Sequence, residues 1–129
     1  MPTILVIDDD QHVRGMLRTV LEDFGYKVLE APDGNIGVQL FSENRVDLII
    51  TDIIMPDKEG LETIREIKAS SPDAKIIAIS GGAKVGPGTY LKLAELMGAQ
   101  RAFEKPIQIS VLLSSIAELL GDQETASPE

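Results

Sequence analysis

The sequence contains no cysteine and no tryptophan among its 129 residues. The absence of cysteine excludes disulfide bonds, metal sites built on thiolates and catalysis by a cysteine nucleophile. A chain without cysteine fits a reducing compartment, and we therefore expect a cytoplasmic location. Aromatic residues make up only 4% of the chain whereas hydrophobic residues make up 43%, so the expected core is aliphatic.

Long apolar runs and clusters of basic residues are also missing. No apolar stretch approaches the roughly 18 residues of a membrane-spanning helix, and no basic segment precedes the short run Ile4–Ile7, as it would in a signal peptide. The 12 basic residues are scattered and are outnumbered by 21 acidic ones, which gives a formal charge of −9. Because a polyanion repels such a chain, we expect no direct DNA binding. Because no apolar stretch is long enough, we expect no membrane insertion either.

What the sequence does contain is an alternation of short β-branched runs with segments of helical periodicity. At about 100–200 residues per domain the chain forms one domain, expected over residues 1–121 with a polar tail over 122–129. Buried strands joined by single helices predict a doubly wound α/β fold with five parallel strands in the order 2-1-3-4-5. Strands are expected at 3–7, 26–31, 46–51, 75–80 and 101–104, and helices near 11–24, 36–41, 60–71, 90–97 and 109–120.

Chemically versatile side chains stand at the ends of four of these strands. They are Asp8–Asp10, Asp52, Ser80 and Lys105. The carboxyl ends of parallel strands meet at one edge of the sheet, so these groups should converge where open α/β sheets bind ligands. Carboxylates packed closely need a cation, a shared proton or shifted pKa values. Mg²⁺ suits this set, because it prefers hard oxygen ligands and leaves coordination positions for a phosphate.

Each of these residues also has an ordinary structural interpretation. The acids Asp8–Asp10 are typical of a helix N-terminus, and Asp52 could cap a turn before Met55. Lys105 taken alone is a surface lysine, and Ser80 taken alone is a hydroxyl bonded to backbone at a strand end. Four such coincidences at four different strand ends are much less frequent than any one of them, so the combined pattern favours a functional site.

Four motifs in this order and spacing resemble the receiver domain of two-component response regulators. They are Ile4–Asp10 (ILVIDDD), Asp47–Gly60 (DLIITDIIMPDKEG), Ile76–Gly81 (IIAISG) and Gly98–Pro106 (GAQRAFEKP). The resemblance covers about residues 3 to 120. It implies a flavodoxin-like, CheY-like (βα)5 fold and a signalling module that accepts a phosphoryl group, not an enzyme that turns over a separate substrate.

The resemblance implies a metal site made of four residues. Asp52 would be the phosphoryl acceptor and a direct ligand of Mg²⁺. Asp9 would also bind the ion directly, the backbone carbonyl of Ile54 would complete the protein ligands, and Asp8 would act through water. Mg²⁺ would then offset the negative charge of the phosphoryl group during transfer to the Asp52 carboxylate.

The resemblance also implies contacts to the phosphoryl group itself. Ser80 would bond the group and move toward it on activation, and Lys105 would pair with its oxygens. Gly81 would leave room for the phosphate and offer its backbone N–H. The bond between Lys105 and Pro106 is cis in similar proteins.

Two features depart from the family's pattern. The switch position three residues before the strand 5 lysine holds Ala102 where an aromatic residue is usual, and Phe103 follows it. Phe103 is therefore a candidate for part of the switch. The segment Gly81–Gly88 is rich in glycine, and it is interpreted either as a tolerated surface insertion or as a face that orders on phosphorylation.

The function implied is a single-domain response regulator in a two-component system or phosphorelay. Its phosphodonor would be a sensor histidine kinase or a histidine phosphotransfer protein, and its output a downstream protein target or a homodimer. The contact surface would comprise the helix near 90–97, the strand 101–104 and the helix 109–120. Two alternatives stay open: an Mg²⁺-dependent phosphohydrolase with an Asp nucleophile, and a scaffold that does not depend on phosphorylation.

Overall fold

The computed structural model describes residues 1–53, 60–80, 92 and 94–121. The expected loop 81–88, the tail 122–129, and the expected site residues Ile54 and Gly81 lie outside these residues. Lys92 and residues 94–96 are helical, within the segment expected to form a helix before the last strand. The elements are β1 (Thr3–Ile7), α1 (Gln11–Asp23), β2 (Lys27–Ala31), α2 (Gly34–Glu43), β3 (Leu48–Asp52), α3 (Gly60–Ser70), β4 (Ile76–Ser80), β5 (Arg101–Glu104) and α5 (Ile109–Leu120).

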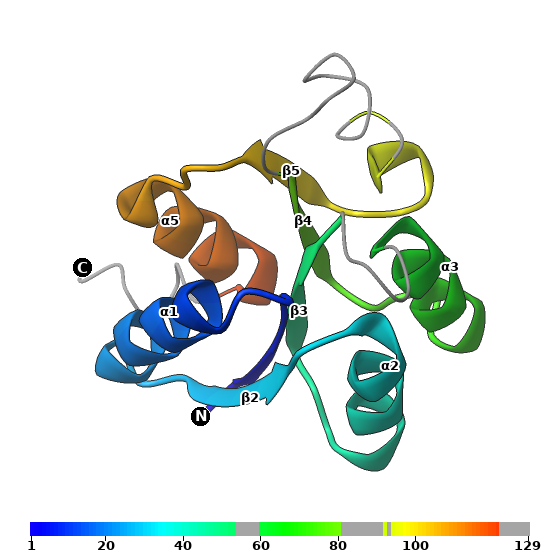
Figure 1. Cartoon of the computed structure of the whole chain (residues 1–129), viewed down its shortest axis with the longest axis horizontal. Helices are drawn as coiled ribbons and strands as arrows, with labels where there is room; N and C mark the ends of the chain where they lie inside the picture. The colour runs from blue at the N-terminus through cyan, green and yellow to red at the C-terminus, as the bar shows by residue number, and fades with distance from the viewer. Residues whose placement is uncertain (54–59, 81–91, 93, 122–129) are drawn as a thin grey trace.

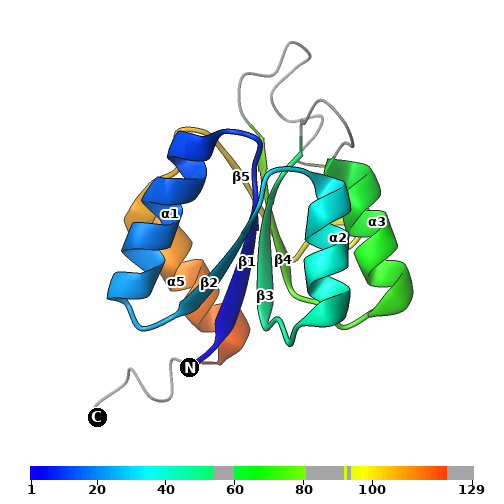
Figure 2. The same ribbon diagram turned by 60° about the horizontal axis from the view of Figure 1, so that its bottom comes forward.

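The five strands form one parallel sheet in the order β2-β1-β3-β4-β5, which confirms the predicted fold. Helices α1 and α5 cover one face of the sheet, and α2 and α3 cover the other (Figures 1 and 2). β1 and β3 are neighbours although α1, β2 and α2 separate them in sequence. The chain therefore reverses its direction of winding between β1 and β3, and this places their carboxyl ends side by side.

Two aliphatic layers hold the helices on the sheet. Alternate residues of β1 face opposite sides: Leu5 and Ile7 pack in the layer with α3, whereas Ile4 and Val6 pack in the layer with α1 and α5. Among the buried core residues that the structure describes, Tyr26 is the only aromatic one, as the low aromatic content predicted. Each fully buried aliphatic side chain contributes about 1.5–3 kcal/mol, so these layers supply the main stabilising term.

The boundaries of β1 and β5 are those predicted, whereas those of β2, β3 and β4 differ from the prediction by one or two residues. Hydrogen bonds explain the shifts of β2 and β3. The third strand begins at Leu48 and not at residue 46, because Asp47 uses its backbone and side chain to bind Thr3: its N–H donates to the Thr3 carbonyl at 2.8 Å and its Oδ2 accepts from the Thr3 N–H at 2.7 Å. The second strand begins at Lys27, because the Tyr26 N–H bonds to the last turn of α1. The fourth begins at Ile76.

Candidate functional site

The carboxyl edge of the sheet brings together side chains from four strand ends. Asp8 follows β1, Asp52 ends β3 and Ser80 ends β4; these three residues are only 2%, 5% and 3% exposed. Lys105 follows β5, and its ammonium group contacts the carboxylates of Asp8 and Asp52. The convergence predicted from the sequence is therefore present in the described residues.

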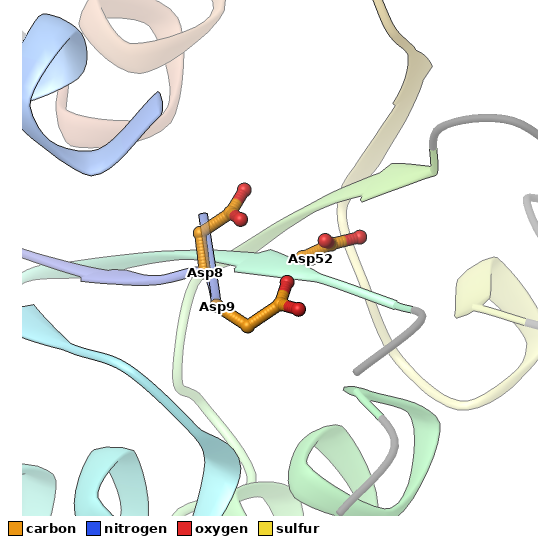
Figure 3. Close-up of side chains that lie close together, drawn as sticks. All are labelled: Asp8, Asp9 and Asp52. Atoms are coloured by element: carbon orange, nitrogen blue, oxygen red, sulfur yellow. The ribbon is translucent and has the colours of Figure 1, made fainter. Parts of the chain in front are cut away.

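Three carboxylates form the centre of this site. One oxygen from each of Asp8, Asp9 and Asp52 lies within 4.8 Å of the others. Figure 3 shows the Asp9 carboxylate turned toward that of Asp52, with Asp8 beside them. Asp9 is exposed whereas the other two are buried, so one side of the cluster is open to solvent. This set of hard oxygen donors fits Mg²⁺ in both chemistry and spacing.

Lys105 partly offsets the negative charge of this cluster. Its Nζ lies 3.1 Å from Asp8 Oδ2 and 3.3 Å from Asp52 Oδ2. Burial of the ammonium group lowers the pKa of Lys105, but attraction to Asp52 and Asp8 outweighs that effect and leaves the pKa above its ordinary value. Lys105 therefore remains protonated at neutral pH.

The three consecutive aspartates have three different environments. Asp10 is the N-cap of α1, and its Oδ1 accepts from the N–H groups of His12 at 2.9 Å and Val13 at 3.4 Å. The ordinary helix-capping interpretation thus holds for Asp10 and not for Asp8. Asp8 Oδ1 instead accepts from the Asp10 N–H at 2.9 Å, while its Oδ2 faces Lys105. Asp9 is left as the exposed carboxylate of the cluster.

The backbone carbonyls of Asp52 and of the next residue, Ile53, each accept a hydrogen bond from a described neighbour. Thr51 Oγ1 donates to the Asp52 carbonyl at 3.0 Å, and the Gly60 N–H donates to the Ile53 carbonyl at 2.7 Å. A Cβ at residue 60 would lie 2.6 Å from the Ile53 Cα and closer still to the Asp52 carbonyl oxygen. Only glycine fits this approach. The sequence motif contains Gly60, but its position eight residues after the end of β3 carries no information about packing.

Ser80 has a free hydroxyl group at the edge of the sheet where the carboxylates lie. Among the described residues, its Oγ is the only buried side-chain polar atom without a hydrogen-bond partner. Its backbone carbonyl accepts from the Lys105 N–H at 2.9 Å, which ties β4 to the residue after β5. The interpretation of Ser80 as a hydroxyl bonded to backbone is therefore wrong, and the side chain is available to a ligand.

The expected switch residues lie in and after β5. Ala102 and Phe103 are half-buried and pack on opposite sheet faces, with the α3 layer and the α5 layer respectively. The Lys105–Pro106 peptide bond is cis, as expected. Pro106 lines an apolar groove of about 470 Å³ together with Lys105, Val13, Met16 and Ile107. The groove thus begins at the site lysine and extends to α1.

Sequence reasoning missed one residue at this site. Arg14 Nη1 donates to the backbone carbonyl of Asp8 at 2.7 Å, and its Nε pairs with Glu30 of β2 at 3.2 Å. The available signal was an arginine one helical turn after the capping Asp10. That spacing alone does not reveal that the side chain folds back to the end of β1.

A doubly wound α/β domain with an acidic cluster, a hydroxyl and an ammonium at its switch point belongs to the class of α/β domains suited to bind a phosphate group together with a divalent cation. Comparison with known proteins identifies the family. Residues 4–117 match the model of the response regulator receiver domain, and the chain belongs to this family. Within the part of the chain that the structure describes, no helix combines the length and hydropathy needed to cross a bilayer.

Individual relatives support this assignment. The chain is 35% identical over 114 residues to the CAI-1 autoinducer sensor kinase/phosphatase CqsS of Vibrio cholerae, covering 88% of this chain and 17% of that protein. It is similar to a CheY-like receiver domain protein from Methanospirillum hungatei (TM-score 0.87, 28% identity, 98% of this chain and 99% of the other). It is also similar to the response regulator TrrA from Thermotoga maritima in complex with Mg²⁺ and beryllofluoride (TM-score 0.82, 31% identity, 93% and 100%). The chain spans between 14% and half the length of its curated relatives.

Proposed function

We propose that this receiver domain accepts a phosphoryl group on Asp52 from a phosphohistidine donor. The Asp52 carboxylate oxygen forms a bond to phosphorus while the P–N bond to the donor histidine breaks, and the released imidazole nitrogen takes up a proton. The observation that carries the proposal is the surroundings of Asp52. The buried Asp52 carboxylate lies 3.3 Å from the protonated Lys105 and beside the acidic pair Asp8 and Asp9. The buried hydroxyl of Ser80, at the same edge of the sheet, has no hydrogen-bond partner among the described residues.

The neighbouring residues each have a part in this proposal. Asp9 and Asp52 would hold Mg²⁺ with the Ile54 carbonyl, and Asp8 would act through water; when bound, the ion neutralises charge on the phosphoryl oxygens. Lys105 would exchange its contact with the Asp52 carboxylate for one with the phosphoryl group. Ser80 would donate its free hydroxyl to a phosphoryl oxygen, and Gly81 would donate a backbone N–H. The solved TrrA complex, which holds Mg²⁺ and beryllofluoride, supports this assignment.

The phosphodonor in this proposal is a sensor histidine kinase or a histidine phosphotransfer protein. The match to CqsS, which is a sensor kinase, supports a two-component setting. The apolar groove of about 470 Å³ between α1 and Ile107 offers the donor a surface beside Asp52, because Lys105 lines the groove and also contacts the acceptor. A cytoplasmic location belongs to the same proposal.

The output in this proposal is a protein contact on the surface around β5 and α5. Leu96 before β5 is 80% exposed and Val111 of α5 is 42% exposed. Phe103 and Val111 border a hollow of about 230 Å³ on this surface. Phosphorylation would replace the single negative charge of the Asp52 carboxylate by a phosphoryl group carrying roughly −1.5 to −2 charges, and this change would bias the surface toward a downstream target or a second copy of the chain. The chain would act as a single domain over residues 1–121, without binding DNA directly.

Intact-mass spectrometry tests the proposal. The protein is incubated with a small phosphodonor such as acetyl phosphate, with and without Mg²⁺, beside Asp52→Ala. We expect one phosphoryl adduct on the wild type that is absent in the variant and without the metal. An adduct that survives in Asp52→Ala would show that another residue is the acceptor. No adduct with any donor would favour the scaffold alternative.

The phosphohydrolase alternative makes a different prediction. It requires repeated turnover of a phosphomonoester that is not a protein partner. We expect p-nitrophenyl phosphate to be hydrolysed to p-nitrophenol and phosphate no faster with the protein and Mg²⁺ than with Asp52→Ala and Mg²⁺. Sustained turnover by the wild type alone would contradict the assignment as a signalling module.

A further inference from the structure

The turn between β1 and α1 carries the acidic pair, and its backbone is tied to β2 at two points. The Asp8 N–H donates to the Ala31 carbonyl at 3.1 Å. The Asp8 carbonyl accepts from Arg14 Nη1 at 2.7 Å, and Arg14 in turn pairs through Nε with Glu30 of β2 at 3.2 Å. Both ends of Asp8 are therefore fixed to the same neighbouring strand, one directly and one through a guanidinium group.

The Arg14 side chain is well placed to hold this turn. It is only 15% exposed, and the Glu30 side chain is 25% exposed. Glu30 also accepts from Arg18 Nη1 at 2.9 Å. The hydrogen bond from Arg18, and then the one from Arg14, lower the pKa of Glu30 against the effect of burial, so its carboxylate stays ionised and holds both guanidinium groups.

The carbonyl that Arg14 binds belongs to the peptide linking Asp8 to Asp9. Because a peptide unit is planar, fixing this carbonyl also fixes the N and Cα of Asp9. Within the described residues no hydrogen bond or ion pair holds the Asp9 carboxylate itself. Its direction therefore depends on the backbone on which it stands.

We propose that Arg14 is a positioning residue for the metal site: its bond to the Asp8 carbonyl holds the Asp8–Asp9 peptide so that the Asp9 carboxylate faces Asp52. The inference rests on the proposed function, because the metal serves phosphoryl transfer to Asp52. Glu30 holds Arg14 in place. Arg18 shares Glu30 but has no contact with Asp8 among the described residues, which makes it a matched control.

The sign of the effect separates positioning from simple electrostatics. Arg14 is a cation near the cluster, so its removal by charge alone would strengthen the binding of another cation. Loss of positioning would weaken it. Partners of metal ligands typically contribute 10- to 100-fold to metal affinity, and we expect Arg14→Gln to raise the Mg²⁺ Kd on the order of 10-fold.

Calorimetric titration with MgCl2 alone tests this inference on wild type, Arg14→Gln, Arg18→Gln and Glu30→Gln. We expect a higher Kd for Mg²⁺ in Arg14→Gln and a smaller increase in Glu30→Gln. In Arg18→Gln the Kd should equal that of the wild type or be slightly lower. Circular dichroism checks that each variant is folded. If Arg14→Gln is unfolded, Glu30→Gln and Arg14→Lys are compared with Arg18→Gln in its place.

Two outcomes overturn the inference. One is an Arg14→Gln Kd equal to or tighter than that of Arg18→Gln; the other is wild-type protein that binds no Mg²⁺. Failure of the proposed function is seen separately, because the mass experiment reports whether Asp52 is phosphorylated. If the wild type binds Mg²⁺ but forms no phosphoryl adduct, the proposed phosphorylation of Asp52 is refuted. The titration of the variants then still decides whether Arg14 positions the metal site.

Discussion

Three identical side chains in a row perform different tasks at this site. Asp8 is buried against Lys105, Asp9 is exposed beside Asp52, and Asp10 caps α1. Chemistry does not separate these residues, since all are aspartates. Their burial and hydrogen-bond partners do, and these depend on where β1 ends and α1 begins.

Removal of the Lys105 ammonium should destabilise the fold without Mg²⁺. Lys105→Met leaves the buried carboxylates of Asp8 and Asp52 without their cation, and we expect a loss of about 2–3 kcal/mol in the free energy of unfolding at pH 7. Urea denaturation in EDTA measures it. Lys27→Met removes the same charge from an exposed site and should change stability by less than about 0.5 kcal/mol. Equal effects of the two substitutions would contradict this role.

The Lys105 contribution should also depend on pH in one direction. Burial lowers the pKa of Lys105, but Asp52 and Asp8 raise it further, so the folded state holds the proton more tightly than the unfolded chain. The contribution is then fully present below the ordinary lysine pKa of about 10.4 and is lost as pH rises through the higher folded value. The stability difference between wild type and Lys105→Met should be level from pH 7 to about 10 and shrink above. A decrease beginning near pH 8 would be inconsistent with this sign.

Gly60 should tolerate no side chain. Gly60→Ala forces a Cβ into the backbone of Asp52 and Ile53, so we expect a loss of stability of about 2 kcal/mol or more, with slower phosphorylation of Asp52. Gly15→Ala is the matched control, because a Cβ in α1 meets nothing within 4 Å and alanine favours a helix by about 1 kcal/mol. The midpoint of thermal unfolding should therefore fall for Gly60→Ala and rise for Gly15→Ala. A Gly60→Ala variant as stable as the wild type would refute the close packing at residue 60.

At the scale of elements, the helices contribute through single buried faces. Leu112 and Ile116 of α5 are fully buried in the layer with β1, β3 and α1, whereas Val111 is 42% exposed. We expect Leu112→Ala to cost about 2–5 kcal/mol in unfolding free energy and Val111→Ala less than about 1 kcal/mol. Guanidinium denaturation of both variants measures this contrast. Similar costs would mean that α5 packs through a different face.

Strand order and strand-end residues could be predicted from the sequence, because buried β-branched runs and their alternation with helices are local patterns. Asp52, Ser80 and Lys105 could be placed for the same reason. The separate environments of Asp8, Asp9 and Asp10 could not, since a shift of one residue at the end of β1 exchanges them. Arg14 and Gly60 make their contacts with residues outside their own helices, and the periodicity of a helix does not reveal such contacts.

At the scale of the whole molecule, the domain carries its acidic site on a sheet that is covered on both faces (Figure 2). The net charge of −9 is consistent with the divalent cation proposed at this edge. The site lies next to the apolar groove at Pro106 and near the hollow at Phe103. A change of charge at Asp52 is therefore close to both proposed contact surfaces.

The central claim is that Asp52 is the acceptor, and chemical localisation tests it most directly. The phosphorylated protein is treated with borohydride, which reduces an aspartyl phosphate to homoserine, and is then digested and sequenced by mass spectrometry. We predict homoserine at position 52 alone, dependent on Mg²⁺ and on the phosphodonor. Homoserine at position 8 or 9, or an adduct that resists borohydride, would contradict the account.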